Sequence, residues 1–168
     1  MSTDPLTPML KTASLHSLLM CVSKGLTRSG FGDVEILDRR LTKQKSRSGG
    51  HEIVCRTNLG TFPLTVVVKV IQDKIRTRMV DELAGTVIRT QADIGLLISP
   101  EGFSKAARAN KEAHRPIRLE FMAGDDLATF LRTTKVGVRR DGDVDYAFFS
   151  ELEEVSERIL AFLKKEDA

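Results

Sequence analysis

The sequence is poor in the features that mark secreted, metal-stapled and membrane proteins. Its two cysteines, Cys21 and Cys55, lie far apart and outside any CxxC motif or histidine pair, so we expect two buried free thiols rather than a disulfide or a zinc site. No run of apolar residues approaches the length of about eighteen that a membrane-spanning helix needs. The N-terminus has neither the basic start nor the apolar stretch of a signal peptide. We therefore expect a cytoplasmic protein without a membrane segment.

Motifs for nucleotide binding are also absent. Neither GxxxxGK nor GxGxxG occurs, and there is no internal repeat or low-complexity tract. What remains is a chain of 168 residues with 41% hydrophobic and 29% charged residues, values typical of a soluble globular protein. A chain of this length can bury a core without disulfides or metal ions, so we expect one domain.

Positive charge is concentrated in the first half of the chain. Residues 1–78 contain 13 Lys or Arg and 6 Asp or Glu, a net charge of +7, whereas residues 79–168 contain 13 and 17, a net charge of −4. The densest segment, RRLTKQKSR at 39–47, suits the phosphate backbone of a nucleic acid. It is equally consistent with a solvated loop whose charges repel one another, since no aromatic residue interrupts it. Its five cations are Arg39, Arg40, Lys43, Lys45 and Arg47.

Hydrophobic periodicity changes along the chain. Apolar residues at helical spacing predict a first helix between Leu15 and Leu26. A meander of three strands follows, and after it amphipathic helices alternate with short apolar strands. This order predicts an α/β fold with a central mixed sheet of about five strands flanked by helices. The strands are predicted at 34–40, 51–57, 64–71, 94–99 and 117–121.

The two ends of the chain are predicted to differ from the central domain, which covers residues 15–134. Residues 1–14 contain two prolines and no periodicity, so we interpret them as a loose arm. Residues 135–145 are interpreted as a polar connector. Residues 146–168 hold a last helix with a wide apolar face, which either packs back on the domain or forms the seam of a homodimer.

One lysine, Lys69, interrupts a strand of β-branched residues, TVVVKVI at 65–71. Burying an unpaired ammonium is expensive, so the residue needs an explanation. It either lies on an edge strand, where lysine is a common device against aggregation, or belongs to a site with a partner carboxylate. Glu52, on the preceding strand, could supply that carboxylate if the two residues face each other in the meander.

The order of elements and several short stretches resemble the restriction endonuclease-like or PD-(D/E)xK fold, a three-layer α/β fold, and within it the Mrr-type catalytic domain. GGHEIV at 49–54 is similar to the family's GGVDLI, which carries a metal-binding acid, and VVVKV at 66–70 is similar to LVQCKR, which carries the catalytic lysine. Lys69 precedes Leu83 by fourteen residues, as the family lysine precedes its helix leucine. The resemblance covers about residues 15–132, and further similar stretches are SGFGDVEI, VDELAG, ADIGLLISPEGFSKAA and IRLEFMAGDDLATFL.

The resemblance implies a phosphodiester hydrolase with a partly altered site. In this family an Asp and a following Glu or Gln hold Mg²⁺, which offsets phosphate charge and activates water. The first position holds Glu52 here, the second holds Val67, which cannot bind a metal, and the lysine is Lys69. The acid often found on the first helix falls at Leu18 or Leu19, both apolar. The resemblance thus implies catalytic roles for Glu52 and Lys69, with Glu52 as the remaining metal ligand and Mg²⁺ binding that is weak or absent.

An acid from elsewhere in the chain could replace the missing ligand. Asp73, Asp81 and Glu82 are near enough in sequence, and migration of a site acid from strand to helix is known in this superfamily. Glu82 also falls where the family often has a glutamate, so its presence alone decides nothing.

Three functions therefore remain open. The first is a DNA-binding protein of the Mrr type with impaired hydrolysis, which contacts duplex DNA through the 39–47 segment and through Lys74 and Arg76, with Arg78 beside them, unless these simply face water. The second is an active Mg²⁺-dependent DNA endonuclease that uses Glu52, Lys69 and a migrated acid. The third is a non-catalytic protein-interaction module whose contact face is the last helix. In the first two, a partner protein or DNA shape would supply sequence specificity, since we expect no separate DNA-reading domain.

Overall fold

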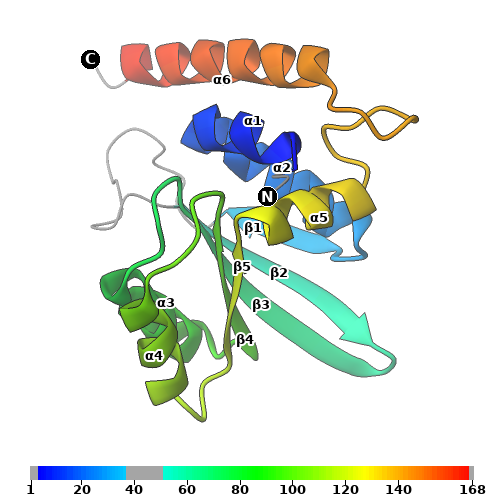
Figure 1. Cartoon of the computed structure of the whole chain (residues 1–168). Helices are drawn as coiled ribbons and strands as arrows, with labels where there is room; N and C mark the ends of the chain where they lie inside the picture. The colour runs from blue at the N-terminus through cyan, green and yellow to red at the C-terminus, as the bar shows by residue number, and fades with distance from the viewer. Residues whose placement is uncertain (1–3, 37–50, 167–168) are drawn as a thin grey trace.

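A five-stranded mixed sheet forms the centre of the molecule. The computed structural model describes residues 4–36 and 51–166. The strands lie in the order β1-β2-β3-β4-β5; the first three are antiparallel and the last three parallel (Figure 1). The predicted α/β fold with a mixed sheet of about five strands is confirmed. The strands are β1 (Asp33–Ile36), β2 (His51–Leu59), β3 (Phe62–Val70), β4 (Ile94–Ser99) and β5 (Leu119–Ala123).

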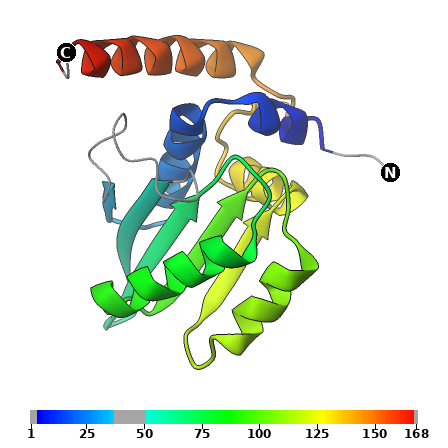
Figure 2. The same ribbon diagram turned by 90° about the vertical axis from the view of Figure 1, so that its left-hand side faces the viewer.

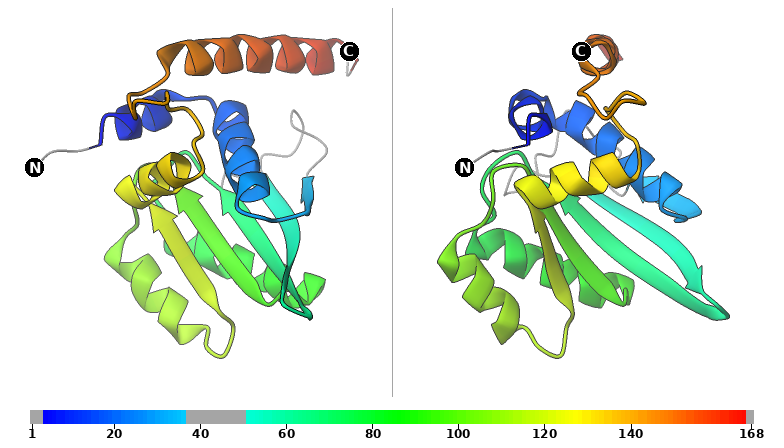
Figure 3. Two further views of the ribbon diagram at one scale, coloured as in Figure 1. Left: turned by 90° about the vertical axis from the view of Figure 1, so that its right-hand side faces the viewer. Right: turned by 45° about the vertical axis from the view of Figure 1, so that its right-hand side comes forward.

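Helices cover both faces of this sheet. Helices α3 (Thr77–Thr90) and α4 (Lys105–Ala113) lie on one face, in front of the sheet in Figure 2. Helices α2 (Leu15–Arg28) and α5 (Asp125–Thr133) lie on the other face, as Figure 3 shows. The molecule therefore has the three layers that the resemblance implies.

The period of two along β3 separates the buried residues into two cores. Val66, Val68 and Val70 point toward α2 and α5, whereas Val67 belongs to the core beneath α3. All four valines are at most 6% exposed, and burial of each side chain contributes about 1.5–3 kcal/mol. Lys69, two residues after Val67, therefore faces the α3 layer.

Lys69 is not on an edge strand. Strand β3 is hydrogen-bonded to β2 on one side and to β4 on the other, which makes it the central strand of the sheet. The side chain of Lys69 is only 1% exposed. The edge-strand interpretation is therefore wrong, and the ammonium needs partners inside the protein.

The interpretation of residues 1–14 as a loose arm is also wrong, because residues 6–12 form the helix α1 (Leu6–Thr12). Leu6 and Leu10, one turn apart, are fully buried in the core on the α2 and α5 side. The two prolines of this segment lie at the N-cap and in the first turn, where a helix needs no donor from them.

The last helix, α6 (Tyr146–Glu166), lies outside α1 and α2 and far from the sheet (Figures 1 and 3). It packs on the domain through Phe149, which is 3% exposed, and through Ser156, which is 1% exposed. Across the described part of the chain, no helix, α6 included, is long and apolar enough to cross a membrane.

Candidate functional site

Glu52 and Lys69 lie side by side on the sheet. They are directly opposed in the antiparallel register of β2 and β3, so their side chains leave the same face. The Lys69 Nζ atom lies 3.9 Å from Glu52 Oε1. The predicted proximity of this carboxylate and ammonium is confirmed by the geometry, while their catalytic roles stay a prediction.

A second carboxylate reaches Lys69 from α3. Lys69 Nζ donates a hydrogen bond of 2.6 Å to Glu82 Oε2, a short charge-assisted contact. Lys69 is buried, but the side chains of Glu52 and Glu82 are 22% and 26% exposed. The ammonium is thus satisfied from inside, while both carboxylates remain open to solvent and to a ligand.

Helix α3 comes this close because β4 carries a glycine beneath it. A Cβ on Gly95 would lie 2.7 Å from Leu119, 2.8 Å from Val87 and 3.0 Å from Leu83. Val87 and Leu83 belong to α3, so a larger residue at position 95 would push the helix away from the sheet. The position of Glu82 over Lys69 therefore depends on this contact between helix and sheet.

One stripe of α3 extends the site. Arg78, Glu82, Thr86 and Arg89 follow one another at intervals of four, four and three residues, which places them on one side of the helix. Arg78 Nε lies 3.4 Å from Glu82 Oε1, and Arg89 Nη2 donates to Thr86 Oγ1 at 2.9 Å. The Thr86 hydroxyl is 3.1 Å from Glu52 Oε1. Two arginines, one lysine and two carboxylates thus form a connected network.

Sequence reasoning missed Thr86 and Arg89, and it considered Arg78 only as a phosphate contact. Their signal was the helical spacing from Glu82, which puts them on its side of α3. The spacing identifies them as site residues only when the side of the helix that faces Glu52 is known. Which side of α3 faces Glu52 is decided by how the helix packs on the sheet, and this tertiary packing cannot be read from the sequence of the helix.

The other family positions hold apolar, fully buried residues. Val67, at the second ligand position, and Leu18 and Leu19, at the position of the first-helix acid, are all 0% exposed. Of the acids considered as replacements, Asp81 is engaged elsewhere: its Oδ1 lies 2.7 Å from both Asn110 Nδ2 and His114 Nε2. These two hydrogen bonds, Asn110 first, lower the pKa of Asp81 below its ordinary value. Glu82 is the candidate that contacts Lys69.

The donor set at the site fits a weakly held Mg²⁺. This ion prefers oxygen ligands and usually takes one or two carboxylates from a protein, with water and phosphate completing its six positions. Glu52 and Glu82 provide two partly exposed carboxylates. Within the described residues, no group of three or more His, Cys, Asp or Glu is placed to hold a metal. The neighbouring Lys69 ammonium would also weaken binding, since it would compete for the same oxygens.

The predicted DNA-binding residues fall into two groups. Arg39, Arg40, Lys43, Lys45 and Arg47 lie outside the described residues. Lys74 and Arg76 are exposed in the segment between β3 and α3, and Arg78 follows in the first turn of α3, where it contacts Glu82.

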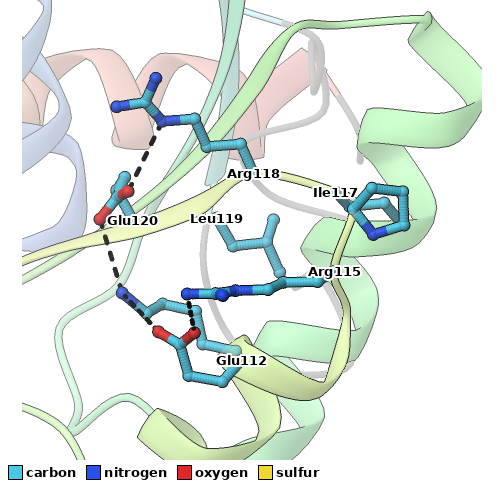
Figure 4. A pocket seen from close by; sticks show the side chains of 8 residues that line it. Glu112, Arg115, Ile117, Arg118, Leu119 and Glu120 are labelled. Atoms are coloured by element: carbon cyan, nitrogen blue, oxygen red, sulfur yellow. Dashed lines mark hydrogen bonds and ion pairs between the residues drawn. The ribbon is translucent and has the colours of Figure 1, made fainter.

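A second charged cluster lies in a pocket of about 640 Å³ between α4 and the start of β5 (Figure 4). Each of its cations contacts a carboxylate: Arg115 pairs with Glu112 at 2.7 Å and Arg118 with Glu120 at 3.6 Å. Lys111 lies 3.8 Å from Glu112 and 3.5 Å from Glu120. Like the site on β3, this cluster combines one lysine with two glutamates. Lys111 is therefore a matched control for Lys69.

A family model and one solved structure agree with this architecture. A model of the Mrr catalytic domain, described as a restriction endonuclease, matches residues 10–131. The restriction endonuclease MspJI, solved in complex with a 27-mer oligonucleotide, superposes with a TM-score of 0.57 at 16% identity, over 89% of this chain and 34% of that one. EndoMS in its apo form superposes with a TM-score of 0.43 at 16% identity, over 62% and 44%. This chain thus spans about a third of the MspJI chain. A search of curated proteins found no match.

Proposed function

This chain belongs to the restriction endonuclease family, and we propose that it hydrolyses phosphodiester bonds of duplex DNA at the site formed by Glu52, Lys69 and Glu82. The contact of Lys69 with two partly exposed carboxylates carries this proposal. A buried ion pair is often replaceable by apolar residues without loss of stability, so the fold alone gives no reason to keep one. Charged groups held together in this way at an accessible place are candidates for chemistry.

The residues of the network divide the work of hydrolysis. A divalent cation, when bound, would offset phosphate charge and lower the pKa of the attacking water. Glu52 and Glu82 would hold this cation, and the Thr86 hydroxyl keeps Glu52 oriented. Lys69 donates to the phosphate oxygen or the water that develops charge in the transition state.

The cations around the site support DNA as the substrate. On α3, Arg78 contacts Glu82 and Arg89 contacts Thr86, and Lys74 and Arg76 are exposed immediately before that helix. The basic segment at 39–47 precedes β2, the strand that carries Glu52. Such cations contact phosphate without reading bases, so sequence choice would come from a partner protein or from DNA shape.

A second candidate is a protein that binds DNA and does not cut it. Val67 favours this function, because the strand position that holds a second metal ligand in the family is a fully buried valine here. Without that ligand, the site depends on Glu82, which is already bonded to Lys69 at 2.6 Å.

Cleavage of supercoiled plasmid in Mg²⁺ or Mn²⁺ tests both functions. For hydrolysis we expect nicking by the native chain, and losses of about 100-fold or more in Lys69→Met, Glu52→Gln and Glu82→Gln. The matched control is Lys111→Met, which removes the lysine from the other lysine and glutamate cluster and should leave the rate unchanged.

The other possible outcomes of these assays decide between the two candidate functions. Equal cleavage by all variants would point to a contaminating nuclease and overturn the hydrolytic proposal. No cleavage, together with band-shift affinity that falls steeply with added salt, would establish the second candidate. Absence of DNA binding at low salt would remove both.

A further inference from the structure

Helix α6 carries an apolar stripe whose second half its own domain leaves exposed. Val155, Ile159 and Phe162 are 49%, 37% and 61% exposed. Together with the half-buried Phe148 and Leu152, they follow one another at intervals of four, three, four and three residues. This period of 3.5 residues is that of a helix seam that packs against another helix.

The exposed part of the stripe, Val155, Ile159 and Phe162, is separate from the contacts that hold α6 on the domain, whereas Phe148 and Leu152 at its start pack against the core. Ser156 Oγ lies 2.7 Å from His16 Nδ1 and 3.0 Å from Ser17 Oγ of α2. The backbone N–H of Ser14 donates to Glu153 Oε1 at 2.8 Å. With the burial of Phe149, these contacts fix the inner side of α6. The three exposed residues on its flank are therefore not needed to attach the helix.

Charge along α6 is divided between its two halves. Residues 146–157 contain four glutamates and no lysine or arginine, whereas residues 158–166 contain three basic residues and one glutamate. Glu151 and Lys165 lie fourteen residues apart, four helical turns, and thus flank the same side of the stripe near its two ends. The helix is therefore complementary to a second copy of itself that runs in the opposite direction.

We propose that the chain forms a homodimer in which the stripes of two α6 helices pack antiparallel. With the two-fold axis near Ile159, Val155 lies opposite Phe162 of the partner subunit, and Glu151 lies opposite Lys165 of the partner subunit. Arg158, close to the axis, is compensated within its own chain by Glu154, whose Oε1 is 2.5 Å from Arg158 Nη2. A parallel pair would instead place the four glutamates of one helix beside those of the other.

This interface leaves the site on β3 open. Helix α6 packs on α2, which covers the opposite face of the sheet from α3 and Glu82. Variants of the stripe should therefore keep any nuclease activity of the single chain, and the two proposals can fail independently.

Light scattering of the full chain during gel filtration is the first test. We expect a mass near twice 18.7 kDa for the native protein and a dimer weakened about tenfold or more in Phe162→Glu, because a buried phenylalanine is lost from each side of the axis. The control is Phe62→Glu, at the turn between β2 and β3, where the phenylalanine is 74% exposed. A native monomer at all concentrations, or equal effects of the two changes, would overturn the proposal.

Cysteine cross-linking tests the direction of the helices. The native Cys21 and Cys55 are fully buried and do not interfere. In an antiparallel pair, Ile159→Cys should oxidise to a cross-linked dimer, Phe162→Cys alone should not, and a mixture of Val155→Cys with Phe162→Cys should. Cross-linking of Phe162→Cys with itself as efficiently as Ile159→Cys would indicate a parallel pair and contradict the charge argument.

Discussion

The ammonium of Lys69 lies where a central strand normally holds apolar side chains. Its neighbours in the core beneath α3 are Val67 of β3 and Ile71, which follows the strand; they are 0% and 1% exposed. Two carboxylates satisfy the charge, and both have access to solvent. The cluster therefore adds little to the free energy of unfolding, because desolvation of the lysine offsets much of its attraction to the carboxylates.

This balance predicts opposite effects on stability for the two sides of the contact. Lys69→Met removes a charge that was costly to bury, so the free energy of unfolding should stay unchanged or rise by about 1–2 kcal/mol. Glu82→Ala leaves the ammonium with the more distant Glu52 and should lower the free energy of unfolding by about 1–3 kcal/mol. Urea unfolding of both variants and of the double variant measures these changes.

The double variant is the internal control, since removing the lysine should recover most of the loss caused by Glu82→Ala. If Lys69→Met proves as destabilising as Glu82→Ala, the cluster is there for stability, and the argument that it is retained for chemistry fails.

At this scale the sequence predicted half of the site. The pairing of Glu52 with Lys69 follows from strands adjacent in the chain, because a short connection between them leaves few registers. Glu82 was one of three acids within reach, and no local pattern separates it from Asp81. The choice is made by the rotation of α3 about its axis, which places Glu82 toward the sheet and Asp81 toward α4.

Among the elements, α3 and β4 show how one small residue positions a site. Gly95 was predicted to lie in a short apolar strand, but its importance comes from Leu83 and Val87 of α3, which pack where a side chain would be. Close approach of this kind is found in the assembled fold and is not visible in the sequence of either element.

Gly95→Ala is expected to lower the free energy of unfolding by about 1–3 kcal/mol, because the added methyl group lies within 3.0 Å of three side chains. Displacement of α3 should also separate Glu82 from Lys69 and reduce plasmid cleavage. Urea unfolding and cleavage assays measure the two effects.

The matched control is Gly85→Ala within α3 itself. Its added methyl group meets the flexible end of Arg89 at 3.1 Å, so it should be tolerated and should stabilise the helix by about 0.5–1 kcal/mol. Similar losses in the two alanine variants would refute the role given to the contact beneath α3.

Elements with a clear hydrophobic pattern were predicted from the sequence, whereas the short helix α1 was not. Strand β4 was placed at its observed bounds, 94–99, and α6 at its observed start. Helix α1 has only seven residues and two prolines around its start. A segment this short is not stable as a helix by itself, so its sequence does not predict a helix in preference to coil. It is held by tertiary contacts, including the hydrogen bond of 2.6 Å from Thr7 Oγ1 to Asp125 Oδ1.

On the scale of the whole molecule, one ion pair joins residues 128 positions apart. Arg132 of α5 donates from Nε to Asp4 Oδ2 at 2.6 Å and from Nη2 to Asp4 Oδ1 at 2.7 Å. This two-point contact joins Asp4, just before α1, to α5. The Arg132 hydrogen bond is the main cause of an Asp4 pKa below its ordinary value of 3.8.

The lowered pKa makes this connection dependent on pH. A carboxyl whose pKa falls on folding stabilises the protein above its unfolded pKa, and this stability is lost as the pH falls through the folded pKa. A double-mutant cycle with Asp4→Asn and Arg132→Gln should therefore give a coupling of about 1–2 kcal/mol at neutral pH that persists to about pH 4. Below that pH the coupling should shrink, because the carboxyl becomes protonated. Urea unfolding of the four proteins across this range measures it, and the cycle cancels the separate bond from Arg132 to the carbonyl of Gly142. A coupling near zero at neutral pH would mean that α1 is held by the packing of Leu6 and Leu10 without help from this ion pair, and a coupling that stays constant down to the acid unfolding transition would contradict its dependence on the Asp4 charge.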